Sequence, residues 1–315
     1  MTEKQLPSSH LADLAQEAAD ILAEGIPENT KRTYRTQWRL FREWCMTHDQ
    51  SCLPARSETL VLYLTERSRT VKVSSLRVAL AAITVAHREA GLTDWKATDL
   101  QNVRVFLRSL SRKKGTRTQP KKALLFEELC EGLPEGDDLK AVRDRAILLL
   151  GFFSAMRRSE ISDLDWEDVE WKKDGFVLHI RQSKTDKLSE GQTVPVPKLE
   201  GGICPLEALE LWLKISESGG SGPLFTSLKS GSRLSAEAIA RVVKQAAERA
   251  GFDPKLYGGH SLRSGFVTTA AQADVEERSI MRITRHSSVK TVRRYMQEGT
   301  DIAKHPAHKI LGDKK

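Results

Sequence analysis

One tyrosine stands in a strongly basic stretch near the end of the chain. Tyr295 is one of four tyrosines, and it closes the sequence RHSSVKTVRRY, which also holds His286 and four Lys or Arg side chains. A phenol has a pKa of about 10, so at neutral pH it attacks an electrophile only with help from cationic neighbours or a base. A tyrosine in this setting is a candidate nucleophile for covalent catalysis.

The other candidates are spread over the preceding 140 residues or so in sequence. They are Arg157 in RRSE, Lys184 in QSKTDK, and His260 with Arg263 in HSLR. Two guanidiniums match the non-bridging oxygens of a phosphate, histidines donate hydrogen bonds or move protons near pH 7, and a lysine can protonate a leaving oxygen. Together they suit phosphoryl transfer to Tyr295. Since no cluster of Asp and Glu suggests a metal site, we expect neither metal nor cofactor.

Each of these residues alone has an ordinary structural explanation. An arginine at the end of a helix usually caps carbonyls or pairs with a carboxylate. A hairpin lysine is usually solvated, and His and Arg three residues apart on a helix are commonly surface or capping residues. Tyr295 follows Val289 and Val292, so it could be a core anchor. The functional interpretation therefore depends on the residues acting together.

The charge of the chain is concentrated in one block. The 315 residues suggest about two domains. Residues 31–122 carry 20 Lys and Arg against 7 Asp and Glu, whereas residues 123–315 carry 29 of each and residues 1–30 carry 1 against 6. Such a basic block suits nucleic acid, with a solvated basic surface as the alternative, and charge alone does not separate DNA from RNA.

Composition also indicates a compartment. The sequence has no apolar run long enough to span a membrane and no secretory signal. The four cysteines form no CxxC pair. We therefore expect a cytoplasmic protein, associated with the nucleoid, without a membrane partner.

The expected elements place these residues on two blocks. Apolar spacing predicts helices at 29–45, 57–68, 73–91 and 99–114, and an acidic amphipathic helix or frayed leader at 8–24. The second block begins with helices at 124–133 and 139–155, continues with two short strands around a turn within 174–198, and returns to helices, including 234–251. The fold class is mainly α with a small β-sheet, and a polar, basic linker joins the blocks.

With these motifs in place, the chain resembles the tyrosine recombinase family, also called the phage integrase family. That family's pattern is an arginine in R-x-S-E, a hairpin lysine, H-x-x-R, a His or Trp, and a tyrosine. The resemblance implies a leader at 1–27, a helical core-binding domain at 28–112, a linker at 113–123 and a catalytic domain with a C-terminal tail at 124–315. One departure is Thr284-Arg285, where the family often has Leu-Gly. Arg285 is therefore a candidate to reach a nearby phosphate.

The resemblance also implies a mechanism, that of a site-specific DNA recombinase which cleaves and rejoins strands through a 3′-phosphotyrosyl intermediate. The implied roles are nucleophile for Tyr295, phosphate clamp for Arg157 and Arg263, general acid for Lys184, base or proton relay for His260, hydrogen-bond donor for His286, and an orienting role for Glu160. Two rivals remain: a DNA-binding protein that does not cut, and a monomeric topoisomerase with similar chemistry.

The expected partner is double-stranded DNA with paired half-sites, bound by a homotetramer with a dimer on each site. The two blocks would grip the duplex from opposite sides. Candidate DNA-binding residues are Lys31, Arg32, Arg35, Arg39, Lys72, Arg77, Arg241, Lys244 and Arg282. The tail at 301–315 resembles the family's C-terminal segment and could pack into a neighbouring protomer or onto its own domain.

Overall fold

A computed structural model describes residues 28–92, 97–115, 121–181 and 191–285, together with residues 289, 292 and 293. The chain divides into two compact units, residues 1–118 and 119–315. The division falls within the segment 113–123 that the sequence suggested as a linker. Each unit is described by itself.

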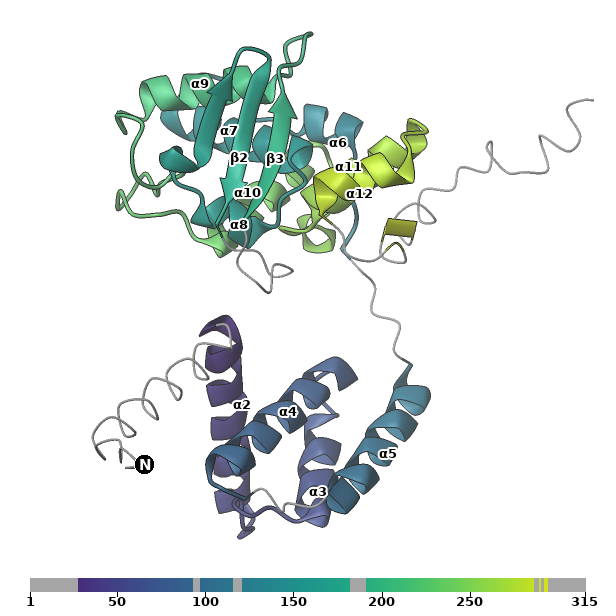
Figure 1. The fold of residues 1–315 in the computed structure, drawn as a ribbon. Coiled ribbons are helices and arrows are strands. Elements are labelled where there is room, and N and C mark those ends of the chain that lie inside the picture. Colours follow the sequence, from purple (N-terminus) through teal and green to yellow (C-terminus); the bar gives the residue numbers. More distant parts are fainter. Residues whose placement is uncertain are drawn as a thin grey trace, which may run out of the picture. The chain divides into compact units, whose positions relative to one another are not determined.

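The described part of the first unit is made of helices. They are α2 (Glu28–Thr47), α3 (Ser57–Arg67), α4 (Val73–Glu89) and α5 (Ala97–Lys114) (Figure 1). Helix α2 packs on α4, and α5 packs on both α3 and α4. Phe41, Leu64, Ile83 and Val103 meet in the core between them and are fully buried. The four helices expected from the apolar spacing of this block are confirmed.

A buried histidine links two parts of this unit. The side chain of His87, on α4, accepts a hydrogen bond at Nε2 from the backbone N–H of Ala55 (2.9 Å), and its Nδ1 lies 2.8 Å from the carbonyl oxygen of Ile83. With Nε2 as acceptor, Nδ1 carries the proton and donates to that carbonyl, so the ring is neutral. Burial lowers the pKa of His87 below 6.5, with the Ile83 hydrogen bond as a smaller opposing effect.

The second unit combines helices with a three-stranded sheet. Its helices are α6 (Phe126–Glu131), α7 (Leu139–Phe153), α8 (Arg158–Asp163), α9 (Pro205–Ile215), α10 (Ala236–Arg249), α11 (Ser261–Gln272) and α12 (Glu277–Thr284), with short 3₁₀ turns at Trp166–Asp168 and Pro254–Leu256. Its strands are β1 (Val169–Lys172), β2 (Gly175–Ile180) and β3 (Gln192–Pro197). This arrangement confirms the predicted class, mainly α with a small sheet.

The sheet is antiparallel, in the order β1-β2-β3. Strands β2 and β3 pair from Gly175 opposite Pro197 to Ile180 opposite Gln192, as the predicted pair of strands requires. Alternate residues of β2 and β3 point into the core. Strand β1 was not expected. Its four residues, VEWK, alternate between apolar and charged, but the run is short and only Val169 is buried.

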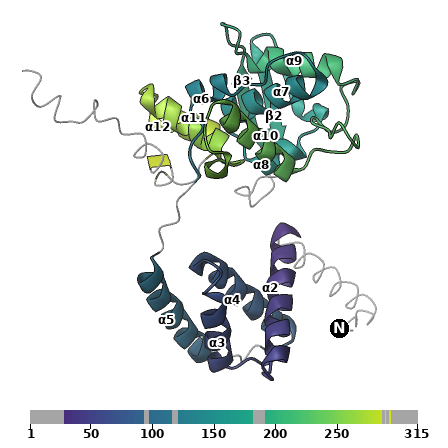
Figure 2. The same ribbon diagram turned by 180° about the vertical axis from the view of Figure 1, so that it is seen from behind.

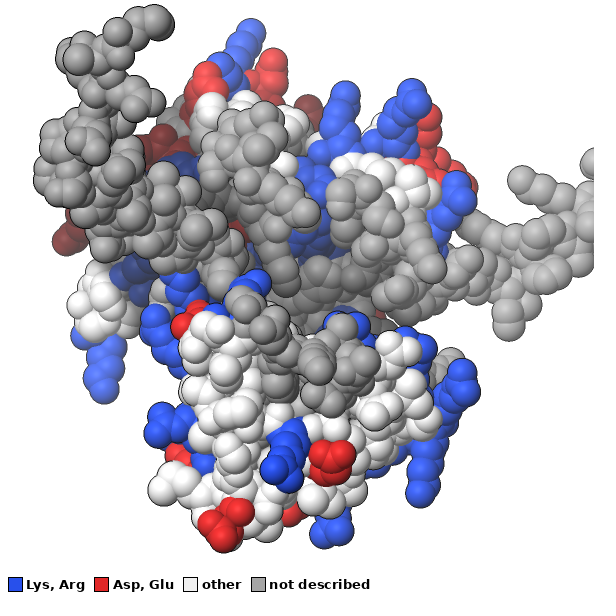
Figure 3. All heavy atoms as spheres, turned by 60° about the horizontal axis from the view of Figure 1, so that its bottom comes forward, with Lys and Arg blue, Asp and Glu red and all other residues white. Residues whose placement is uncertain are grey.

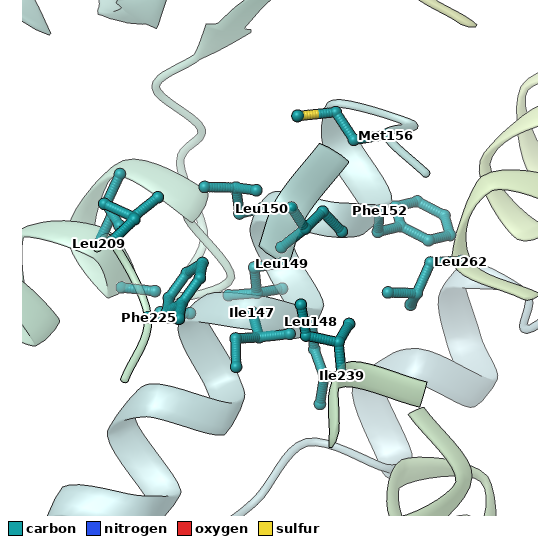
Figure 4. Close-up of a cluster of buried hydrophobic side chains, with 14 of the residues drawn as sticks. Ile147, Leu148, Leu149, Leu150, Phe152, Met156, Leu209, Phe225, Ile239 and Leu262 are labelled. Atoms are coloured by element: carbon teal, nitrogen blue, oxygen red, sulfur yellow. The ribbon is translucent and has the colours of Figure 1, made fainter. Parts of the chain in front are cut away.

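Helix α7 is the centre of the second unit. Ile147, Leu148, Leu149 and Leu150 are consecutive and all buried, so this helix is covered on every side (Figure 4). The sheet lies in front of α7 in Figure 1, while α10 faces the viewer in Figure 2. At its N-terminus the side chain of Asp138 accepts hydrogen bonds from the backbone N–H groups of two residues of the first turn.

Helix α11 is packed unusually close to the start of the unit. A Cβ on Gly265 would lie 1.8 Å from the carbonyl oxygen of Leu124, so only glycine fits at this crossing. The backbone N–H of Leu124 also donates to the carbonyl of Ser261 (3.0 Å). These two contacts fix the N-terminal half of α11, which carries two of the candidate site residues.

Candidate active site

The first candidate arginine lies at a strained turn between α7 and α8. Helix α7 ends at Phe153, slightly before the predicted end near Ala155. Ala155 takes a left-handed conformation, with φ at 48°, and turns the chain so that Arg157 becomes the N-cap residue of α8. A non-glycine residue adopts this conformation at an energetic cost, and such strain is concentrated at functional sites.

Glu160 holds Arg157 at this turn. One carboxylate oxygen of Glu160 lies 2.6 Å from Nη1 of Arg157, and the other accepts the backbone N–H of Arg157 at 2.9 Å. The carboxylate therefore caps α8 and orients the guanidinium at the same time. The Glu160 side chain is 4% exposed, whereas that of Arg157 is 20% exposed and remains accessible.

A second arginine reaches the same carboxylate from the other end of the unit. Nη2 of Arg285 lies 2.8 Å from Oε2 of Glu160, and the Arg285 side chain is 7% exposed. The sequence suggested that Arg285 could reach a phosphate, but in the structure its guanidinium is paired with Glu160. Burial acts to raise the pKa of Glu160, but the charge of Arg285 and the hydrogen bonds from Arg157 and Arg285 outweigh it, so the pKa lies below 4.5.

Arg263 approaches the turn from α11. Its side chain is fully buried, and its Nη1 donates to the carbonyl oxygen of Ala155 at 2.7 Å. Ala155 precedes Arg157 by two residues. Arg157 and Arg263, which are about a hundred residues apart in sequence, therefore lie at the same turn. The structure thereby brings together Arg157, Glu160 and Arg263, as the sequence motifs suggested.

His260 lies beside both of these arginines. It is the N-cap residue of α11, and the residue as a whole is exposed. Partial desolvation and, after it, the charges of Arg263 and Arg157 lower the pKa of His260 below 6.5. The imidazole is therefore neutral at pH 7 and can accept a proton.

Three predicted site residues, Lys184, His286 and Tyr295, lie outside the described residues, as do the leader at 8–24 and the tail at 301–315. Described residues close to Lys184 and Tyr295 in the sequence do have defined contacts.

Arg181, the last described residue before Lys184, is tied to the loop that follows α8. Its Nη2 contacts Oδ2 of Asp165 at 2.5 Å and Oδ2 of Asp168 at 2.7 Å. Arg233 pairs with the other oxygen of Asp165. These groups and Glu160 line a cavity of about 360 Å³. The acidic residues here neutralise the two arginines, so we interpret the cavity as a structural network that anchors the end of β2.

Val292, three residues before Tyr295, is anchored as well. Its side chain is fully buried in a small cluster with Val267 of α11 and Ile280 of α12. The neighbouring Arg293 pairs with Glu277 at the start of α12 (3.2 Å). Val292 and Arg293 are thus held against α11, which carries Arg263, and α12, which ends next to Arg285.

The candidate DNA-binding residues are at the surface. All of those on the first unit are exposed except Lys31, which is partly exposed, and the three on the second unit are exposed. Figure 3 shows Lys and Arg side chains projecting from the helical unit at the bottom of the view, with some acidic side chains among them. Arg77 also lines a cavity of about 560 Å³ with Tyr34, Arg104 and Arg108.

Sequence reasoning missed two features of the structure. Arg104 and Arg108, four residues apart on α5, join Arg77 at the cavity, and their helical spacing was a signal that could have found them. The Arg285–Glu160 pair spans 125 residues and has no local signal.

No group of three or more His, Cys, Asp or Glu is placed to hold a metal ion in the described part of the chain, and no helix there is long and apolar enough to cross a membrane.

Comparisons with known proteins agree on one family. A model of the phage integrase family matches residues 123–300. The chain is 34% identical over 295 residues to a protein of Selenomonas ruminantium named integrase/recombinase xerD homolog, covering 91% of this chain and 86% of the relative. It is also 26% identical over 298 residues to tyrosine recombinase XerA of Pyrococcus furiosus, covering 94% and 91% of the two chains.

Solved structures share the fold. The integrase of the Tn1549 transposon, in complex with transposon right end DNA, matches with a TM-score of 0.63 at 17% identity, covering 94% of this chain and 98% of that one. A lambda integrase tetramer bound to a Holliday junction matches with a TM-score of 0.60 at 17% identity, covering 94% and 80%. At this level of identity the likeness concerns the fold.

Proposed function

The chain belongs to the phage integrase family of site-specific DNA strand transferases, and we propose that Tyr295 is the nucleophile with which it opens a DNA strand. The phenolic oxygen attacks the scissile phosphorus, and the bond from phosphorus to the 5′ oxygen breaks. The products are a 3′-phosphotyrosyl link and a 5′-hydroxyl. Attack by a 5′-hydroxyl of a partner duplex reverses these bond changes, so each broken phosphodiester is replaced and no ATP is consumed.

Arg157 and Arg263 are proposed to clamp the non-bridging oxygens of that phosphate. The observation that carries this assignment is the 2.7 Å hydrogen bond from Arg263 to Ala155, since it brings the two arginines to one turn. Their shared effect on the pKa of His260 supports the same proximity. Preorganised donors of this kind stabilise the charge that develops on the transferring phosphoryl group, and one donor is worth about 10²–10³ in rate.

The remaining roles concern protons and orientation. We assign His260 as base or proton relay, for which a pKa below 6.5 leaves the ring neutral at pH 7. Lys184 would protonate the leaving 5′ oxygen, and His286 would donate a hydrogen bond to a non-bridging oxygen. Glu160 orients Arg157 and does not need to touch DNA, since both its oxygens are engaged by arginines.

The first unit is proposed to supply DNA affinity. We assign residues 28–112 as the core-binding domain, 113–123 as the linker and 124–315 as the catalytic domain. To the DNA-binding candidates given above we add Arg104 and Arg108, because they share a cavity with Arg77. Assembly as a homotetramer on paired half-sites belongs to the same proposal, supported by the lambda integrase tetramer with the related fold.

Covalent trapping tests the proposal. The probe is a pool of duplexes of randomised sequence, each with one nick, so that cleavage near the nick releases a short strand and prevents rejoining. Wild-type protein should yield protein–DNA adducts that survive denaturation, and sequencing of the trapped DNA gives the site. Tyr295→Phe should yield none while still binding DNA, whereas Tyr63→Phe, a matched control buried in the core of the first unit, should behave as wild type. Adducts formed by Tyr295→Phe would refute the assignment.

A second assay separates a recombinase from a topoisomerase. Two duplexes of different length that carry the trapped sequence are mixed with wild-type protein, and the products are sized on a gel. Exchange of strands between the duplexes is expected. Relaxation of supercoiled DNA without exchange would favour the monomeric topoisomerase.

A further inference from the structure

Arg285 occupies a position that suits glycine. It is the C-cap residue of α12, with φ at 55° and ψ at 40°, and its backbone N–H donates to the carbonyl oxygen of Met281 at 2.8 Å. Glycine adopts this left-handed conformation without steric cost, whereas a side chain does so at a cost. An arginine here must therefore gain something through its side chain.

What the side chain gains is a buried ion pair. The Arg285 and Glu160 side chains are 7% and 4% exposed, and their Nη2 and Oε2 atoms are 2.8 Å apart. The same Oε2 accepts the backbone N–H of Arg157, and Oε1 binds the guanidinium of Arg157. One carboxylate thus links the end of α12 to the start of α8.

The link joins two parts of the proposed reaction centre. Arg157 is the proposed phosphate clamp at one end. At the other end, Arg285 is followed immediately in the sequence by His286, and Tyr295 follows nine residues later. Glu160 contacts both arginines through its carboxylate. Loss of the Arg285 contact would leave this carboxylate less constrained, and its hold on the Arg157 guanidinium would weaken.

We propose that Arg285 is a positioning residue of the strand-cleavage site: through Glu160 it holds Arg157 in place and fixes the point at which the chain that carries His286 and Tyr295 leaves α12. The reaction that is positioned rests on the proposed function, whereas the contact itself does not. A direct role on phosphate is disfavoured, because the guanidinium is enclosed and already paired with a carboxylate.

The test uses Arg285→Gly, which removes the side chain and suits the backbone. Its matched control is Glu217→Gly, an exposed residue after α9 in the same unit, whose φ is 53°. Both variants place glycine at a position with a left-handed backbone and so remove the steric cost of a side chain there. Only Arg285→Gly breaks the ion pair with Glu160. Arg285→Lys serves as a second variant, since it keeps a cation at the position and should recover part of any loss.

Two measurements are made on full-length protein. The first is the rate of covalent adduct formation on the nicked duplex at saturating DNA, together with the DNA affinity. The second is hydrogen–deuterium exchange at the Arg157 amide, which donates to Glu160 and reports on the turn without any reaction. For Arg285→Gly we expect unchanged affinity, an adduct rate lower by on the order of 10²-fold, and faster exchange at this amide. Glu217→Gly should match wild type in both.

A further arm shows whether Arg285 acts through the carboxylate. Glu160→Gln should itself slow adduct formation, and adding Arg285→Gly to it should cost much less than adding Arg285→Gly to wild type. Additive losses would mean that Arg285 acts by another route, which overturns the positioning role.

The outcomes are distinguishable. If Arg285→Gly has wild-type exchange at the Arg157 amide, the inference is overturned, whatever happens to the adduct rate. If wild-type protein forms no adduct on any duplex, the proposed function fails, and the exchange measurement still decides whether Arg285 positions Arg157. Faster exchange combined with a slower, Glu160-dependent adduct rate supports both.

Discussion

At the scale of single residues, three arginines of the second unit lie close to one turn. Arg157, Arg263 and Arg285 gather around the turn after α7, and among the described residues Glu160 is the carboxylate that binds Arg157 and Arg285 directly. Buried charge is costly unless it is balanced. The Arg157 side chain is 20% exposed, so its guanidinium remains accessible to an anion from outside the protein, such as a phosphodiester.

A second residue, far from this centre, gives a pH-dependent prediction. His87 is neutral and buried, and its pKa is lowered by burial, whereas in the unfolded chain it has the ordinary value of about 6.5. As pH falls through about 6.5 the unfolded chain binds the proton first, so the free energy of unfolding decreases, by at most about 1.4 kcal/mol per pH unit for one group. Above 6.5 the contribution is fully present.

Urea unfolding of wild type and His87→Gln from pH 5 to 8 measures this effect. Glutamine can accept the Ala55 N–H but does not titrate, so the variant should lose less stability than wild type as pH falls. Equal slopes in the two proteins would contradict a neutral, buried His87.

The site residues differ in how far the sequence could predict them. Arg157 with Glu160, and His260 with Arg263, are three residues apart, so one turn of backbone holds each pair together and a local motif reveals it. The meeting of Arg263 with Ala155 and of Arg285 with Glu160 spans more than a hundred residues. Such contacts depend on how α11 and α12 pack, and no spacing in a single sequence encodes that.

At the scale of elements, the position of α11 depends on one glycine. Gly265 lets the helix approach the backbone of Leu124, and an added methyl group would meet the Leu124 carbonyl oxygen at 1.8 Å. Because the obstacle is backbone, it does not move aside easily. We expect Gly265→Ala to destabilise the protein by about 1–3 kcal/mol, despite the better helix propensity of alanine.

Denaturant unfolding provides the measurement, with Gly258→Ala as the control. A Cβ on Gly258 would lie 3.8 Å from its nearest neighbour, an ordinary contact, so that variant should fold with wild-type stability. Equal stability of Gly265→Ala and wild type would show that α11 can shift away from Leu124 at no cost.

The segment before Tyr295 depends on another contact between elements. Val292 is fully buried against Val267 and Ile280, so Val292→Ala leaves a small cavity and weakens this attachment by about 1–2 kcal/mol. If the attachment positions Tyr295, the rate of adduct formation at saturating DNA should fall by up to about tenfold, since 1.4 kcal/mol corresponds to that factor.

Val289→Ala is the matched control, because Val289 is 40% exposed and the same truncation leaves no cavity there. Its adduct rate should equal that of wild type. A Val292→Ala protein with a wild-type rate would show that Tyr295 is positioned independently of α11 and α12.

The sequence predicted elements where periodicity is strong. Helices α2 to α5 have a clear apolar face, and the alternation of β2 and β3 predicted both strands. Strand β1 has four residues, of which one is buried, so its alternation is too short to predict a strand, and its pairing with β2 makes it one. The end of α7 was placed slightly late, because the left-handed backbone of Ala155 is imposed by its surroundings and is not a property of alanine.

At the scale of the whole molecule, charge and chemistry are divided between the two units. The basic block at 31–122 carries 20 cationic against 7 anionic side chains, whereas residues 123–315 carry 29 of each. In the second unit, acidic residues such as Asp165 and Asp168 neutralise arginines outside the reaction centre. Long-range attraction to DNA should therefore come mainly from the first unit, while the second contributes the proposed site of cleavage.

This division predicts how binding responds to salt. Each phosphate that the protein neutralises releases counterions, so the logarithm of the affinity falls with the logarithm of salt concentration, with a slope of about −0.9 per contact. With about six to ten contacts, affinity should drop by about 10³–10⁵ between 50 and 200 mM salt.

Filter binding with Tyr295→Phe protein measures this without cleavage. In that background Arg32→Ala, on the exposed face of α2, should make the slope shallower by about one unit. Lys229→Ala, an exposed lysine of the second unit outside the candidate set, should leave the slope unchanged, because the charge it removes is not one that attracts the duplex. If Arg32→Ala and Lys229→Ala altered the slope equally, the basic block would have no special part in binding. If the affinity did not change with salt concentration, phosphate contacts would be ruled out as its source.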